Sequence, residues 1–486
     1  MDSQQSDVPL FEALVKYVGK NKISFHTPGH KHGEGIDSQF RQWAGENIFK
    51  MDLTLLPELD SLHEPTGVIR EAQKLATEAY GADKTFFLVN GTSGGNHIMI
   101  FATCYPQDKI IVPRNAHRSV IAGVMFAGAI PIYIQPEFHT ELNIFLNVTP
   151  AGVRRALEKF PEARAVLITH PTYHGITANL VEIATLVHRH GKVLLVDEAH
   201  GPHFKFHESL PISGMDAGAD ICVQSTHKII GGLTQSSMLH ARRGRVNIPR
   251  LKKAFQLFQT TSPSYLLMVS LDLARRQMAL YGRELEEKAI HLSQKLRQGI
   301  NSIDGFCSFG KEIIGLPGVH DLDVTKVTIN VKQSGFTGYQ VADLLNRNYN
   351  IQVEYADQWN ILLLVTFGNR EEDIKQVLRA LQSISRTRPK KAEVDLLAED
   401  YPCEVPEMVL SPREALAALT RTVRLKDALG FVCAETISPY PPGIPLLVPG
   451  ERITPEILEY LLTISRPGIK IKGLNNGLQT IKVVRE

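Results

Sequence analysis

Two stretches decide the fold: residues 192–201 (KVLLVDEAHG) and residues 221–232 (ICVQSTHKIIGG). Each begins with a short apolar run rich in β-branched residues and continues into a turn with polar side chains. Similar runs, with helical patterns between them, span residues 85–89, 109–112, 130–134 and 165–169. This alternation is typical of βαβ units, so we predict an α/β fold with a mostly parallel sheet covered on both faces. Ligands bind beyond the carboxyl ends of the strands in such a sheet, which makes these turns candidate sites.

The rest of the chain is predicted to form smaller parts around this sheet. We expect an N-terminal arm over residues 1–60 and a large domain over residues 61–300. A smaller α/β domain should cover residues 301–390, and a C-terminal domain should cover residues 391–486. The basic run RTRPKK at residues 386–391 indicates a solvated linker between the last two.

Composition excludes several classes of protein. The 486 residues are 43% hydrophobic and 21% charged, with a net charge of +2, as in an ordinary globular protein. A near-neutral chain lacks the concentrated basic charge that nucleic-acid binding needs. The longest uncharged apolar stretch, residues 120–134, contains Pro131 and is too short to span a membrane. The five cysteines include no CxxC pair, so we expect a cytoplasmic protein without a disulfide framework or a thiolate zinc site.

A lysine and an acid follow two of the predicted strands. Lys228 lies in STHK, just after the strand at residues 221–224, and Asp197 follows the strand that precedes it. A lysine in apolar surroundings can attack a carbonyl as a neutral amine, although a lysine flanking a strand is more often a surface residue. Asp197 can face a ligand or cap the next turn. A Schiff-base lysine and an acid for a pyridinium nitrogen are what a pyridoxal 5′-phosphate (PLP) site requires.

Two further turns can supply the rest of such a site. NGTSGGN, at residues 90–96, has small residues that let helix N–H groups approach a phosphate, although many turns are Gly-rich for packing reasons alone. No GxxxxGK[ST] or GxGxxG string supports a P-loop or dinucleotide site. His117, in RNAHRS at residues 114–119, can lie on a cofactor ring or serve as an exposed helix cap.

Distinctive strings run through the chain from residue 25 to residue 450. They are FHTPGHKHG (25–33), DLTLLPELDSLHEPTGVI (52–69), NGTSGGN (90–96), RNAHRS (114–119), DEAHGPH (197–203), STHK (225–228), TTSPSY (260–265) and PYPPGIPLLVPG (439–450). Together they resemble the ornithine/lysine/arginine decarboxylase family of fold-type I PLP enzymes. The resemblance implies an aspartate-aminotransferase-like fold with PLP bound in the large domain.

The resemblance also implies roles for particular residues. Lys228 would form a Schiff base with PLP, Asp197 would pair with the pyridinium nitrogen and His117 would stack on the ring. Thr261 and Ser262 match the residues with which a second subunit completes the pocket, which implies a homodimer or a higher homo-oligomer with shared sites. The remaining cofactor contacts would come from Ser93, Gly94, Ser225, His227 and His200.

The sequence departs from the larger family members in two places. Those members carry an N-terminal wing domain that builds decamers, whereas here the FHTPGH string begins at residue 25. We therefore expect the short form and the dimer, and not the decamer. Gly94 stands where larger relatives have a hydroxyl residue, so its contact with the phosphate would come from the backbone.

The activity implied is decarboxylation of a basic amino acid. We expect L-arginine to give agmatine and CO2 for polyamine synthesis, because short members are most often associated with agmatine. Lysine, giving cadaverine, and ornithine, giving putrescine, are the alternatives. Lys228 or His227 would return a proton to Cα. A distal cation on the substrate needs a carboxylate, and the candidates are Asp60, Glu64, Glu354 and Glu435.

Two other classes of protein are kept as alternatives. A metal hydrolase could use two groups of potential ligands. They are His26, His30 and His32, and the D-x-x-H-x-x-H string of Asp197, His200 and His203. The other alternative is a PLP-binding protein that has lost catalysis, which the intact STHK and DEAHG strings oppose. Otherwise we expect no bound metal.

Overall fold

The computed structural model describes residues 3–387, 404–440, 444–465, 470–475, 477 and 479–485. Most of the predicted linker at residues 386–391, the domain boundary at residue 391 and part of the string at 439–450 lie outside the described residues. Two compact units divide the chain: Met1–Thr103 with Leu195–Glu286, and Cys104–Leu194 with Glu287–Glu486. We call them the first and the second unit. The four predicted domain ranges stay predictions.

The first unit is built on four strands in the order β1 (Lys84–Leu88), β10 (Ser237–Ala241), β9 (Ile221–Gln224) and β8 (Val193–Asp197), the last of which begins in the second unit. Strands β8 and β9 are parallel, whereas β10 runs antiparallel to both β9 and β1. Only the short helix α9 (Thr226–Ile229) lies between β9 and β10, and it is too short to carry the chain back along the sheet for a parallel strand. Strand β10, between β1 and β9, is thus antiparallel within a sheet that was expected to be mostly parallel.

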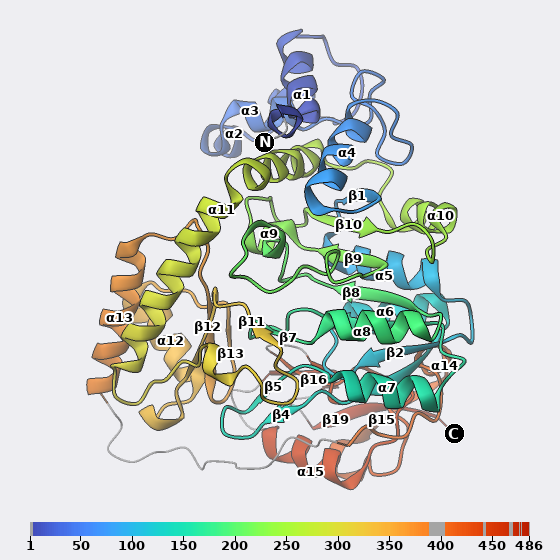
Figure 1. Cartoon of the computed structure of the whole chain (residues 1–486), viewed down its shortest axis with the longest axis vertical. Helices are drawn as coiled ribbons and strands as arrows, with labels where there is room; N and C mark the ends of the chain where they lie inside the picture. Colours follow the sequence, from blue (N-terminus) through green and yellow to red (C-terminus); the bar gives the residue numbers. More distant parts are fainter. Residues whose placement is uncertain are drawn as a thin grey trace. The chain divides into compact units, whose positions relative to one another are not determined.

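Helices cover the strands of the first unit. Helix α5 (Gly91–Thr103) follows β1 directly and packs against α10 (Ile248–Phe258), as Figure 1 shows. Gly95 allows α5 to lie close to the sheet, because a Cβ at this position would come within 2.9 Å of Leu88 and Val223. This close packing brings the N-terminus of α5 to the ends of the strands.

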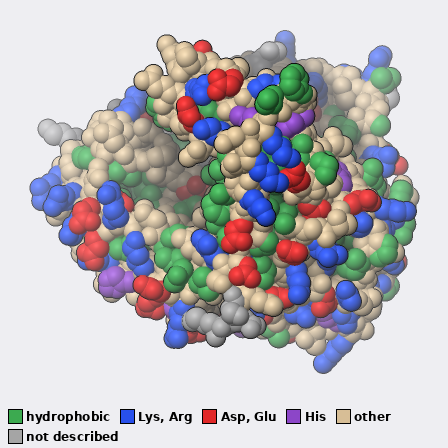
Figure 2. Space-filling model, turned by 90° about the horizontal axis from the view of Figure 1, so that it is seen from above, with side chains coloured by type: hydrophobic (Ala, Val, Ile, Leu, Met, Phe, Trp, Pro, Cys, Tyr) green, Lys and Arg blue, Asp and Glu red, His purple; other side chains and the backbone are tan. Residues whose placement is uncertain are grey.

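The N-terminal arm is anchored on the start of α11 (Tyr265–Asn301). The backbone N–H of Leu10, in α1 (Pro9–Gly19), donates to Asp272 (3.1 Å), and Arg275 donates to Asp272 and to the carbonyl of Asp7 (both 2.6 Å). Further along, the arm forms α2 (Ser38–Ala44), α3 (Glu46–Met51) and, after a loop, α4 (Val68–Tyr80). In the face seen in Figure 2, hydrophobic side chains lie among charged ones and histidines. The arm's most exposed apolar side chains are Ile23, Phe25 and Trp43.

The second unit contains further parallel strands. They lie in the order β6 (Ala165–Thr169), β2 (Lys109–Pro113) and β3 (Ile130–Ile134), and β2 is parallel to both neighbours. The covering helices are α6 (Arg118–Ala127), α7 (Pro150–Lys159) and α8 (Leu180–Arg189). The strands and helices of both units thus alternate as predicted, and the α/β class is confirmed.

Two smaller groups of elements follow in the second unit. Strands β12 (Lys326–Asn330), β14 (Asn360–Leu364) and β13 (Tyr355–Ala356) share a hydrophobic core with α12 (Gly338–Tyr349) and α13 (Glu371–Arg386). A second core lies among the elements β15 (Thr420–Arg424), β19 (Thr480–Val484), β18 (Leu474–Asn475) and α15 (Pro455–Ile464).

A buried ion pair ties this C-terminal group to the end of β2. Arg114 donates to both carboxylate oxygens of Glu451 (2.7 and 2.8 Å) and to the carbonyl of Leu446 (2.8 Å). Both charged side chains are at most 5% exposed. Within the described ranges, no helix has the length and apolar character needed to cross a membrane.

Candidate active site

Asp197 is the last residue of β8, and Lys228 lies on α9 just beyond β9. Because β8 and β9 are parallel, their carboxyl ends meet at one edge of the sheet. The first unit therefore brings the predicted acid and the predicted lysine to the same edge.

The Asp197 carboxylate is buried and held from two sides. Its side chain accepts a hydrogen bond from the Asn96 amide (2.8 Å) and another from the backbone N–H of Ala199 (3.2 Å). Asn96, on α5, is 1% exposed. The sequence analysis assigned no role to Asn96, although the residue ends the NGTSGGN string. The two donors fix the direction in which the carboxylate faces.

Lys228 is half-buried and contacts a histidine from the turn after β8. Its Nζ lies 2.9 Å from Nε2 of His200, which is 5% exposed. His227 faces elsewhere, since its Nδ1 donates to the carbonyl of Ser236 (2.8 Å). Burial lowers the pKa of His227, and the Lys228 charge adds to this effect. His227 is therefore held mainly neutral, with its one ring proton committed to Ser236.

The turn predicted to cradle a phosphate is joined to the lysine-bearing turn. The hydroxyl of Thr92, in the first turn of α5, lies 2.7 Å from Oγ of Ser225 and 3.3 Å from Oγ of Ser237. Thr92 and Ser225 are buried, whereas Ser93 is exposed and Gly94 is buried. Thr92 was not among the predicted residues, whereas its neighbours Ser93 and Gly94 were, because the sequence pattern does not indicate which hydroxyl of the string faces the next strand.

Thr261, Ser262 and His117 are further residues predicted to contact the cofactor. Thr261 and Ser262 are exposed in the segment between α10 and α11. His117 belongs to the second unit and caps α6, where its Nδ1 accepts from the backbone N–H of Ser119 (3.2 Å). The capping alternative thus holds for His117, and its stacking on a cofactor stays a prediction.

Asp60, one of the four candidate carboxylates for the substrate cation, has a structural task. One oxygen accepts from the N–H groups of Ser61 and Thr66 (2.8 and 3.0 Å), and the other accepts from Gly67 and Ile69 (2.8 and 3.1 Å). These bonds satisfy the N-terminus of α4 and occupy the lone pairs that a substrate would need. We therefore assign Asp60 to the start of this helix.

The other three candidates differ in their surroundings. Glu435, in the second unit, forms an ion pair with Lys482 (2.7 Å). Glu354 belongs to the same unit and is exposed. Glu64 is exposed in the first unit, and no ion pair holds its carboxylate within the described residues. Its neighbour His63 hydrogen-bonds through Nε2 to the carbonyl of Thr260 (2.8 Å), which places Glu64 near the segment with Thr261 and Ser262.

The groups proposed as metal ligands do not assemble. The described residues hold no cluster of three or more His, Cys, Asp or Glu side chains with metal-binding geometry. His30 instead bonds to Asp52 (3.2 Å) and His200 to Lys228 (2.9 Å). The metal-hydrolase alternative therefore has no support in this part of the chain.

A line of buried polar side chains crosses the sheet next to Asp197. Thr85 lies 2.9 Å from Nδ1 of His240, whose Nε2 lies 3.1 Å from Oε1 of Gln224. Gln224 in turn donates to Glu198 (2.6 Å), which also accepts from Cys222 (3.1 Å). Burial raises the pKa of Glu198 to about 7 and lowers the pKa of His240 to about 3. The sequence analysis did not find this network, because strand register decides which polar side chains meet.

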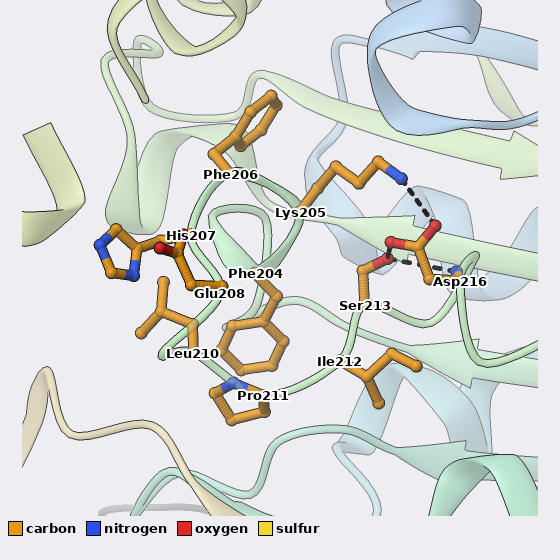
Figure 3. Close-up of a pocket in the computed structure, with 10 residues that line it drawn as sticks. All are labelled: Phe204, Lys205, Phe206, His207, Glu208, Leu210, Pro211, Ile212, Ser213 and Asp216. Carbon is orange, nitrogen blue, oxygen red and sulfur yellow. Dashed lines mark hydrogen bonds and ion pairs between the residues drawn. The ribbon is translucent and has the colours of Figure 1, made fainter. Parts of the chain in front are cut away.

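A hollow of about 460 Å³ lies along one loop of the first unit, between Phe204 and Asp216 (Figure 3). At its edge Asp216 binds Lys205 (2.6 Å) and accepts from Ser213 (2.7 Å). None of the predicted site residues lines this hollow. The sheet edge, and not this hollow, is the candidate active site.

The chemical groups at this edge of the sheet are of the types that PLP binding requires. Lys228 offers an amine, and Asp197 offers a buried carboxylate whose direction is fixed by Asn96. The N-terminus of α5 and the Thr92 and Ser225 hydroxyls offer hydrogen-bond donors for a phosphate. All of these residues belong to the first unit.

Comparison with known proteins identifies one family over most of the chain. Residues 8–373 match the family described as Orn/Lys/Arg decarboxylase, major domain, and residues 395–486 match its C-terminal domain. The chain is 42% identical over 483 residues to the arginine decarboxylase of Bacillus anthracis, a match that covers 99% of this chain and 98% of the relative.

Solved structures agree with this placement. The lysine decarboxylase LdcF of Francisella novicida is 26% identical, with a TM-score of 0.84 over 99% of this chain and 82% of that one. The serine palmitoyltransferase of Sphingomonas wittichii, at 18% identity and a TM-score of 0.55 over 74% of this chain and 86% of that one, shares the fold alone. The chain therefore belongs to the Orn/Lys/Arg decarboxylase family, as a fold-type I decarboxylase whose cofactor is PLP.

Proposed function

We propose that this protein converts L-arginine to agmatine and carbon dioxide and so feeds polyamine synthesis. The observation that carries the reaction type is the sheet edge that holds Lys228 and a buried, oriented Asp197. Arginine is supported by the 42% identity with an arginine decarboxylase, against 26% with the lysine decarboxylase LdcF. Lysine and ornithine are the alternative substrates.

Bound PLP supplies an electron sink for the electron pair that the departing carboxylate leaves behind. Asp197 would pair with the ring nitrogen of bound PLP, and the hydrogen bond from Asn96 keeps that carboxylate from turning away. The Lys228 amine would hold the cofactor, and once released from it would be available to deliver a proton to Cα. His227 is the weaker proton donor of the two candidates, because its lowered pKa leaves it mainly neutral and its ring proton is bound to Ser236.

We further propose that two copies of the chain form the working unit. Residues that complete the site of a neighbouring subunit must be exposed in a single chain. Thr261 and Ser262 meet this requirement, because both are exposed. The arm also exposes Ile23, Phe25 and Trp43, which a partner could cover. We place the enzyme in the cytoplasm, in keeping with the absence of a disulfide at Cys104, Cys222, Cys307 and Cys433, the cysteines within the described residues.

The substrate is tested by incubating the PLP-loaded protein separately with L-arginine, L-lysine and L-ornithine. Released carbon dioxide gives the rate, and mass spectrometry identifies the amine. Agmatine as the fastest product is expected. Cadaverine or putrescine in its place would move the assignment to lysine or ornithine. A protein that binds PLP and releases no carbon dioxide from any of the three would support the alternative without catalysis.

A further inference from the structure

Gln259 is a buried residue that the sequence analysis left without a role. It follows the last turn of α10, where its backbone N–H donates to the carbonyl of Phe255 (3.0 Å). Its side chain is 5% exposed. Thr260, the next residue, is exposed, so the chain leaves the protein interior immediately after Gln259.

One end of the Gln259 side chain is fixed at the turn before α5. Its Oε1 accepts a hydrogen bond from the backbone N–H of Val89 (3.1 Å), at the end of β1. Because this oxygen is the acceptor, the amide NH2 group must face the other way. Nε2 lies 3.6 Å from the point that a Cβ would occupy on Gly94, at the N-terminal end of α5.

The NH2 group of Gln259 has no hydrogen-bond acceptor among the described residues, although the atom is buried. A buried donor without an acceptor is costly, so such a group points to something that accepts.

A second side-chain donor lies close to this NH2 group. The Asn90 amide nitrogen is 3.5 Å from the same point on Gly94. The first turn of a helix presents N–H groups that lack partners inside the helix. In α5, Gly91 and Gly94 find acceptors in Gln235 and Asn90. A cluster of donors at a helix N-terminus is suited to an anion.

We propose that Gln259 is a further ligand of the cofactor phosphate, with Nε2 as the donor. The proposal rests on the PLP-dependent function above and adds a contact that the sequence motifs did not indicate. Gln259 would act from within its own subunit, whereas Thr261 and Ser262, in the exposed segment that follows, are expected to serve the partner. One short segment would then contact the phosphates of both sites.

The test compares affinities for PLP, for pyridoxal, which lacks the phosphate, and for inorganic phosphate. Gln259→Glu keeps an oxygen for Val89 and nearly the same size, but replaces the donor NH2 with an acceptor oxygen. We expect this variant to weaken PLP and inorganic phosphate at least tenfold, measured by titration of the apo-protein, and to leave pyridoxal within twofold. Gln259→Met, without charge or hydrogen bonds, should show a smaller loss of the same kind.

The matched control is Gln256→Glu on the same helix. The Gln256 amide donates to the carbonyl of His63 (3.1 Å), so the control makes the same chemical change away from α5. It should bind PLP, pyridoxal and phosphate as the unchanged protein does. An equal loss of PLP and pyridoxal in the Gln259 variants would overturn the proposal and assign Gln259 a purely structural role.

Other outcomes also decide the proposal. Binding of PLP and inorganic phosphate within twofold of the unchanged protein in both Gln259 variants would mean that Nε2 has another partner, such as water. If neither variant folds, a crystal structure of the unchanged holoenzyme decides, and a distance above about 3.5 Å from Nε2 to every phosphate oxygen rejects the contact. Failure of the unchanged protein to bind PLP would instead reject the proposed function.

Discussion

Asp197 and Lys228 differ in how tightly the protein holds them. Asp197 is buried and receives two hydrogen bonds, so its carboxylate has one direction before any ligand arrives. Lys228 is half-buried and contacts His200 through its amine, the group that we propose binds the cofactor. The acid is preorganised, while the amine is held by a partner from which it can be released.

Lys228→Ala should abolish decarboxylation, because the variant lacks the amine that we propose holds the cofactor. PLP should remain bound without a covalent link. Borohydride treatment followed by peptide mass mapping checks this, since only the unchanged protein should carry a reduced adduct at Lys228. A rate within about tenfold of the unchanged protein, or about 1.4 kcal/mol in barrier, would show that the covalent lysine is another residue.

Asp197→Asn should keep PLP and lose several orders of magnitude in kcat, because a neutral amide cannot hold a pyridinium proton. Asn96→Ala should cost less, about 10- to 100-fold, since it removes one hydrogen bond to a charged group, worth about 1.5–3 kcal/mol. Steady-state rates and cofactor absorbance measure both variants. An Asp197→Asn variant that keeps most of the activity would contradict the assigned role of the carboxylate.

Glu64→Gln tests the carboxylate for the distal cation of the substrate. We expect KM for arginine to rise about 10- to 100-fold, as when a charged hydrogen bond is lost, with a smaller change in kcat. Glu71→Gln, which changes an exposed acid of α4 in the same way, is the control and should leave KM unchanged. An unchanged KM in Glu64→Gln would leave Glu354 and Glu435 as the candidates.

At the scale of elements, the bounds of several strands could be predicted from the local sequence pattern. The strands at residues 130–134, 165–169 and 221–224 have the predicted bounds, because each apolar run is closed by turn residues. The antiparallel direction of β10 depends on the length of the α9 connection, which the apolar runs do not reveal.

The partners in the site depend on packing between elements far apart in sequence. Asn96 meets Asp197 only because α5 packs on the sheet beside β8. Thr92 meets Ser225 because two turns reach the same edge. The sequence therefore predicts a role for residues with distinctive chemistry, Lys228 and Asp197, and does not reveal their contacts with Asn96 and Thr92, which depend on position; the catalytic roles of Lys228 and Asp197 stay predictions.

The buried network across β1, β10, β9 and β8 should make stability depend on pH. The ordinary pKa of glutamate is 4.5, and burial raises that of Glu198 to about 7, so the folded state binds more protons between these values. The stabilising contribution of Glu198 is therefore present below about pH 4.5 and is lost as pH rises to about 7. By linkage, the free energy of unfolding should fall by on the order of 3 kcal/mol between these two pH values.

Glu198→Gln should remove this dependence. Melting temperatures measured from pH 4.5 to 7.5 should fall less steeply with pH in the variant than in the unchanged protein. Glu284→Gln, at an exposed position of α11, is the control and should follow the unchanged protein. Parallel curves for Glu198→Gln and the unchanged protein would mean that Glu198 does not titrate in this range.

At the scale of the whole molecule, the prediction concerns two chains. Lys228→Ala and a Thr261/Ser262 double-alanine variant should each be inactive alone if Thr261 and Ser262 complete the partner's site. Mixed in equal amounts, they should recover about a quarter of full activity, because about half the dimers are hybrids with one intact site. No recovery, with subunit exchange confirmed by mass, would place Thr261 and Ser262 within their own subunit's architecture.

The ion pair between Arg114 and Glu451 has a consequence for how this protein can change over time. Replacing either partner alone leaves an uncompensated charge in the interior, which costs about 3–5 kcal/mol. Replacing both together with apolar residues of similar volume is often neutral. Single substitutions at either position should therefore be rare. In an alignment of relatives, the residues at 114 and 451 should change together. The group of elements around Glu451 therefore restricts variation in a turn more than three hundred residues earlier in the chain.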